Sequence, residues 1–88
     1  MKILIKKLSK QEIANKNINN WPIWTCEKST FNWEYGEKES CLIIEGSVTI
    51  KTNYEIVNLL PGDFVIFPKG LKCKWDVIEP IKKHYTFE

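Results

Sequence analysis

The stretch from Gly62 to Trp75 constrains the fold of this chain more than any other segment. It reads Gly-Asp-Phe-Val-Ile-Phe-Pro-Lys-Gly-Leu-Lys-Cys-Lys-Trp, which predicts a turn, an apolar strand, a second turn and a further strand. Pro68 and Gly70 make the second connection short. Such closely spaced strands are typical of a small antiparallel β protein.

Alternating apolar residues continue this β character upstream. Phe31, Trp33 and Tyr35 alternate with polar residues, which is the period of a half-buried strand. The apolar segments at 41–44 and 48–50 are interpreted as the two arms of a hairpin that turns near Glu45 and Gly46.

A proline divides the C-terminal part of the chain. Glu79-Pro80 is expected to end a strand over 71–78, and a last strand follows over 81–87. About eight short strands with little helix predict an all-β sandwich or barrel.

The first 20 residues differ from the rest. They predict an opening strand and a short helix, because Ser9 and Glu12 have the spacing of a capping box. The Asn-rich run 15–20 is expected to be a loop. We therefore expect one domain over 1–88, with a β-barrel over 21–88.

Composition and charge exclude several classes of protein. The net charge of +2 and the scattered lysines, grouped only at 6–7 and 82–83, argue against a nucleic-acid partner. No apolar run approaches the roughly 20 residues that span a bilayer, so no membrane partner is expected. Three cysteines without C-x-x-C spacing, and no recognisable signal peptide, predict a cytoplasmic protein.

Three segments, 21–24, 41–46 and 61–75, together resemble the small single-domain cupins. The resemblance is to the ureidoglycine aminohydrolase-like or ethanolamine-utilisation-like branch, which is of the DUF861 type. It implies an RmlC-like, antiparallel jelly-roll β-barrel with a pocket inside one end. A homodimer is a further expectation of the family.

The resemblance also shows how this chain departs from metal-binding cupins. The two histidine positions of the first motif fall on Trp33 and Tyr35, and the histidine of the second motif is replaced by Cys73. Only Glu39 keeps the identity of an expected ligand. We therefore expect no metal cofactor; if a metal bound, its ligands would be Glu39, Cys41 and Cys73.

Strand periodicity predicts which residues line the pocket, because residues two apart share a face. The expected lining is Trp24, Trp33, Tyr35, Glu39, Cys41, Leu71, Cys73 and Trp75. Its aromatic rings would either stack a planar or sugar-like ligand or simply fill the barrel.

Glu39 and Cys73 are the candidate catalytic residues. Glu39 would act as a general acid or base or anchor a ligand, or would be a carboxylate satisfied by amides, Tyr35 or a lysine. Cys73 would need a base such as His84, the single histidine, to act as a nucleophile. Otherwise Cys73, like Cys41, is a small buried apolar residue.

The sequence is compatible with three functions. The first is a metal-independent barrel that binds a small molecule in an aromatic pocket. The second is an enzyme that acts on a small metabolite, of the ureidoglycine aminohydrolase or sugar-modifying type. The third is a structural or interaction module whose barrel is filled by its own side chains.

Overall fold

The structure, a computed structural model, describes all 88 residues of the chain. Seven strands form one antiparallel sheet system, and a short helix and a 3₁₀ turn follow the first strand. The elements are β1 (Leu4–Lys7), α1 (Lys10–Asn15), η1 (Ile18–Asn20), β2 (Ile23–Cys26), β3 (Ser29–Glu34), β4 (Glu39–Lys51), β5 (Ile56–Leu59), β6 (Asp63–Phe67) and β7 (Lys72–Phe87). No helix is long and apolar enough to span a membrane.

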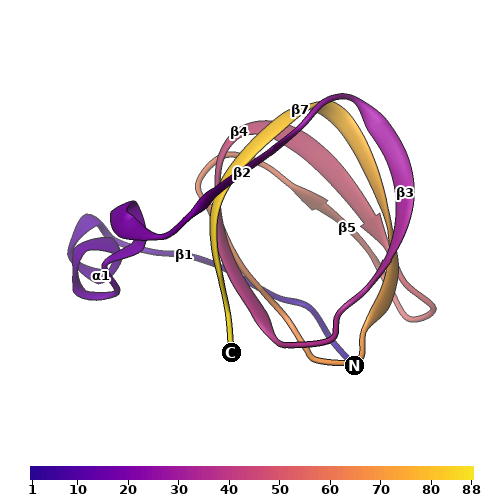
Figure 1. Cartoon of the computed structure of the whole chain (residues 1–88), viewed down its shortest axis with the longest axis horizontal. Coiled ribbons are helices and arrows are strands. Elements are labelled where there is room, and N and C mark those ends of the chain that lie inside the picture. Colours follow the sequence, from indigo (N-terminus) through magenta and orange to yellow (C-terminus); the bar gives the residue numbers. More distant parts are fainter.

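Two long strands, β4 and β7, organise the jelly roll. Their first and last halves pair with different neighbours, so both strands run through two layers. One layer has the order β1-β6-β4-β7-β2, and in the other β5 lies beside β4 and β3 beside β7. Figure 1 shows the strands curling around one interior, with α1 outside them. The ladder is open, because β1 and β2 form its ends.

The strands bend from one layer into the other where Gly46 of β4 meets Pro80 of β7. The register of the β4–β7 pair shifts between residues 43 and 48, and Gly46 has a φ of 88°. A Cβ at this glycine would collide with the Pro80 carbonyl oxygen. The predicted hairpin turn at Glu45-Gly46 and strand end at Pro80 are therefore wrong: both are irregularities inside continuous strands. The structure therefore has two long strands, β4 and β7, where the sequence predicted two pairs of short strands.

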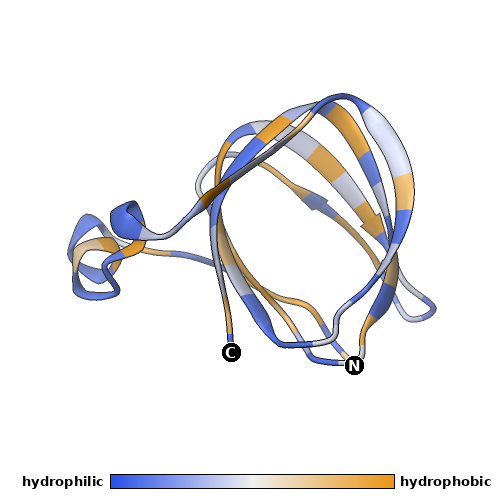
Figure 2. Cartoon of the chain, viewed as in Figure 1, coloured by the Kyte–Doolittle hydropathy of each residue, from blue (hydrophilic) through white to orange (hydrophobic).

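The core lies between the two layers. It is built from 14 buried residues of the strands and adjoining loops, among which are Trp75, Phe67 and Tyr35. Apolar and polar residues alternate along several strands in Figure 2, as expected for strands with one buried face. This alternation is what directs the aromatic side chains of β3 and β7 toward the interior.

The N-terminal segment covers the outer face of the first layer. The predicted capping box is confirmed: Glu12 N donates to Ser9 Oγ at 3.1 Å, and Ser9 N donates to Glu12 Oε1 at 3.0 Å. The loop expected at 15–20 instead contains η1, which places Ile18 in a second apolar cluster with Leu42 and Phe64. This cluster is separate from the core.

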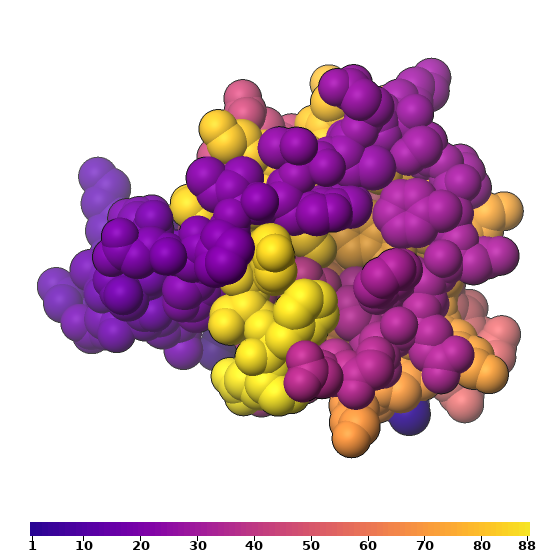
Figure 3. All heavy atoms as spheres, viewed as in Figure 1, coloured from indigo at the N-terminus to yellow at the C-terminus, as the bar shows by residue number.

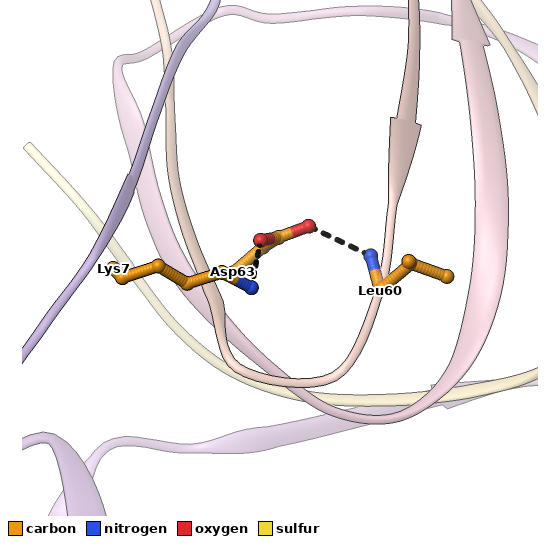
Figure 4. A network of polar contacts seen from close by, with 3 residues as sticks. All are labelled: Lys7, Leu60 and Asp63. Atoms are coloured by element: carbon orange, nitrogen blue, oxygen red, sulfur yellow. Dashed lines mark hydrogen bonds and ion pairs between the residues drawn. The ribbon is translucent and has the colours of Figure 1, made fainter.

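The turn before β6 is held by Asp63, whose carboxylate makes two contacts. Asp63 Oδ2 accepts from the Leu60 backbone N–H at 2.8 Å, and Lys7 Nζ lies 2.6 Å from Oδ1 (Figure 4). The Pro-Gly-Asp turn predicted from the sequence is thereby tied to β1.

Candidate functional site

An aromatic cavity of about 230 Å³ opens at one side of the interior. In Figure 3 the surface is hollowed between the C-terminal residues and the β3 segment. Seven of the nine lining residues are apolar or aromatic. The lining is Trp24, Phe31, Trp33, Tyr35, Glu39, Trp75, Lys83, Tyr85 and Phe87.

A buried ion pair supplies the two charges of this cavity. Lys83 Nζ lies 2.7 Å from Glu39 Oε2, and the side chains are only 6% and 3% exposed. Glu39 opens β4 and Lys83 lies near the end of β7, where these two strands run antiparallel. Their opposite charges compensate each other in surroundings where a single charge would be costly.

Aromatic rings surround the Lys83 ammonium. Its Nζ lies 4.8 Å from the ring centroid of Trp24 and 4.6 Å from that of Trp75, distances at which the π faces attract a cation. Phe31 stacks on Trp75 with a centroid distance of 6.0 Å and an interplanar angle of 10°. The walls are therefore fixed by contacts among the rings themselves.

The outer part of the cavity is more exposed. Trp33 is 50% exposed and Phe87 is 42% exposed, and both lie in the lining. Trp33 meets Tyr35 edge-on, with ring centroids 6.4 Å apart. Large apolar side chains thus lie open to solvent beside a buried polar pair, which is the arrangement of a ligand pocket.

Some of the polar atoms in the lining make no hydrogen bond within the protein. Glu39 uses Oε2 for Lys83, whereas Oε1 takes part in no hydrogen bond of the structure. Burial raises the pKa of Tyr35, and the nearby Glu39 carboxylate raises it further, so the hydroxyl stays neutral. The cavity therefore offers a free carboxylate oxygen and a neutral hydroxyl to a ligand.

Five of the eight predicted pocket residues line the cavity. They are Trp24, Trp33, Tyr35, Glu39 and Trp75. Cys41, Leu71 and Cys73 do not belong to its lining, because they are packed into the core between the two layers. Cys73 instead borders a second, polar hollow beside Lys72 and Lys74.

The geometry does not support Cys73 as a nucleophile. His84 belongs to the outer face, where its Nδ1 lies 2.9 Å from the Trp21 carbonyl oxygen and Leu42 is its partner on β4. Cys73 belongs to the core on the other face. Burial raises the pKa of Cys73 to about 11, which disfavours the thiolate. The Cys73–His84 pair considered as an alternative from the sequence is therefore not formed.

The side chains of the site also do not fit a metal ion. No group of three or more His, Cys, Asp or Glu side chains comes together, so Glu39, Cys41 and Cys73 do not form the three-ligand site considered from the sequence. One oxygen of Glu39 is already bound by Lys83, and burial raises the pKa of Cys41 to about 12. A thiolate ligand is correspondingly disfavoured.

Four lining residues were missed from the sequence. They are Phe31, Lys83, Tyr85 and Phe87. The signal for the last three was present, because Lys83, Tyr85 and Phe87 are two apart on the last strand. Lys83 was noted only as one of two adjacent lysines with Lys82, and the sequence gives no direct sign that β7 brings it beside Glu39.

Comparison with known proteins identifies the family. The sequence profile of the EutQ-like cupin domain matches residues 14–85, which is most of the chain. The chain is a EutQ-like cupin. This confirms the family and the all-β jelly-roll fold that the motifs predicted. Comparison of this cupin with curated proteins gives no match.

Solved structures agree with this assignment. The cupin is similar to a DUF861 family protein from Thermotoga maritima, with 39% identity, a TM-score of 0.96 and coverage of 99% of this chain and 100% of that one. It shares the fold of the Clostridium difficile EutQ protein, with 23% identity, a TM-score of 0.68 and coverage of 74% and 52%, so it spans about half the length of that protein. A putative ethanolamine utilization protein Q from Salmonella typhimurium has the same fold at 14% identity and a TM-score of 0.67, with coverage of 99% and 69%.

Proposed function

We propose that this cupin binds a small ring-shaped molecule in the aromatic cavity, without a metal. The observation that carries the proposal is a cavity with mostly aromatic walls that also holds a buried Lys83–Glu39 ion pair. Aromatic walls give a ring favourable stacking, and a few fixed polar groups orient it. The polar groups here are the free Glu39 oxygen, Lys83 and the Tyr35 hydroxyl.

The size of the cavity limits the ligand. Pockets for drug-sized molecules have volumes of about 300–1,000 Å³, and this one is smaller at about 230 Å³. A single ring with few substituents is the size that fits. The cavity also weighs against the hypothesis of a structural module with a filled barrel, since Trp33 and Phe87 leave it open to solvent.

The four tryptophans of the chain provide a direct test. Trp24, Trp33 and Trp75 line the cavity, whereas Trp21 packs on the outer face against Phe64. In ¹H–¹⁵N spectra of labelled protein titrated with single-ring fragments, a ligand should shift the indole signals of the first three and leave that of Trp21 in place. Fragments that move no indole signal, or that move Trp21 equally, would contradict the proposal.

A matched pair of variants strengthens this test. Trp24→Ala should weaken fragment binding, because it removes one wall and one of the two rings beside Lys83. Trp21→Ala, a substitution of the same size outside the cavity, should leave binding unchanged. The enzyme hypothesis, the homodimer and the cytoplasmic location stay predictions, which turnover assays, sedimentation and cell fractionation would test.

A further inference from the structure

The proposed function leaves open which polar groups the ligand carries. The unused hydrogen-bond donors and acceptors of the cavity indicate them, an inference that rests on the proposed function. Lys83 carries three N–H donors, and its one hydrogen bond goes to Glu39 Oε2. Glu39 Oε1 accepts no hydrogen bond. The ion pair therefore presents a donor next to an acceptor, both on lining residues.

The charge of the site favours a neutral ligand. Lys83 and Glu39 already compensate each other, and the other seven lining residues carry no charged side chain. An anion or a cation would bring an uncompensated charge into apolar surroundings, which is costly. A neutral molecule with one donor and one acceptor side by side would meet both groups without that cost.

The aromatic walls restrict the shape of that molecule. Flat rings stack best on aromatic faces, and the donor and acceptor must then lie in the plane of the ring to reach the ion pair. A cyclic amide has this geometry, because its N–H and C=O groups are adjacent, held cis by the ring and coplanar with it. A saturated ring is puckered, and a cis-1,2-diol on it holds one of its two hydroxyl groups axial, out of the mean ring plane.

We propose that the cavity binds a neutral, planar, single-ring cyclic amide. Its N–H donates to Glu39 Oε1, its carbonyl oxygen accepts from Lys83 Nζ, and its faces pack against the aromatic lining. The Tyr35 hydroxyl, kept neutral by burial, belongs to the same lining.

The test compares three small rings by titration of the tryptophan indole signals. The probes are 2-pyridone, N-methyl-2-pyridone, which lacks the N–H, and cis-cyclohexane-1,2-diol. We expect 2-pyridone to bind at least about tenfold more tightly than the other two, since hydrogen bonds to charged groups are the stronger kind. Equal binding of both pyridones, or tighter binding of the diol, would overturn this inference and leave the proposed function standing. Failure of every ring to bind would overturn both.

Variants locate the contact. Glu39→Gln keeps the side-chain volume and replaces the charged acceptor by a neutral amide oxygen, so it should reduce the preference for 2-pyridone over its N-methyl form. Glu45→Gln makes the same chemical change in the exposed part of β4 and should preserve the preference. An undiminished preference in Glu39→Gln would overturn the assignment. If that variant does not fold, the comparison of the two pyridones on the wild-type protein still decides.

Discussion

Lys83 Nζ and Glu39 Oε2 lie 2.7 Å apart inside a ring of aromatic side chains, and this pair joins the two long strands of the jelly roll. Glu39 occupies the position at which the motif of metal-binding cupins has its glutamate ligand. Here the positive charge beside that carboxylate is the Lys83 ammonium. The pair therefore bears on the stability of the fold as well as on the character of the cavity.

Breaking this pair from one side should destabilise the protein strongly. Lys83→Met leaves the Glu39 carboxylate buried without a partner, and Glu39→Leu leaves the ammonium in the same condition. Each substitution should lower the free energy of unfolding by about 3–5 kcal/mol. Urea unfolding followed by tryptophan fluorescence measures the loss.

The double variant Lys83→Met/Glu39→Leu is the control for this prediction. It removes both charges together, so its loss of stability should be much smaller than the sum of the two single losses. Additive losses would show that the two side chains do not interact in the folded protein.

Substitution of Gly46 should destabilise the bend between the layers. Gly46→Ala places a Cβ against the Pro80 carbonyl at a φ of 88°, and the backbone of β7 offers no flexible atom that can move aside. We expect a loss of more than about 3 kcal/mol in the free energy of unfolding. Gly36→Ala is the matched control, because its Cβ would meet no atom within 4 Å. Equal stability of the two variants would contradict the strained bend.

The bend also shows where sequence reasoning succeeds and fails for the fold. The alternation around Trp33 and the Ser9–Glu12 capping box depend on neighbours in sequence, and both were predicted. Gly46 and Pro80 looked like ends of strands because each disfavours regular β structure locally. Gly46 of β4 lies against the Pro80 carbonyl of β7 where the register of the two strands shifts, so the strands bend there together and continue. That pairing depends on residues 34 positions apart, which no local pattern reveals.

For the candidate site, too, local sequence patterns are predictive and long-range pairing is not. Strand periodicity around Trp33 and Cys41 predicted that Tyr35 and Glu39 face the pocket, and both line the cavity. The partner of Glu39 was not identified, because Lys83 reaches it only through the register of β4 with β7. A functional role was expected for Cys73 from its motif position alone, but its side chain is packed in the core.

Thiol reactivity should distinguish the three cysteines. Cys26 is partly exposed, whereas Cys41 and Cys73 are buried and their pKa values are raised to about 12 and about 11. At pH 8 a disulfide reagent should therefore label one thiol per native chain quickly and the other two only after unfolding. Cys26→Ser should remove the fast reaction. A fast reaction that survives in this variant would place a second thiol at the surface.

The buried thiol of Cys41 should lower the stability of the protein at alkaline pH. Burial raises the pKa of its thiol from an ordinary value of 9.0 to about 12, because the thiolate would be desolvated in the core. The unfolded chain ionises at the lower value, so the contribution of Cys41 to stability is complete below about pH 9 and is lost as the pH rises toward 12. The difference in unfolding free energy between the wild type and Cys41→Val should therefore shift by up to about 1.4 kcal/mol per pH unit in this window, to the disadvantage of the wild type. Urea titrations of both proteins at pH 8 and pH 10 measure this shift, and all other ionising groups cancel in the comparison. A difference that stays constant between the two pH values would mean that the Cys41 thiol is not desolvated by the fold.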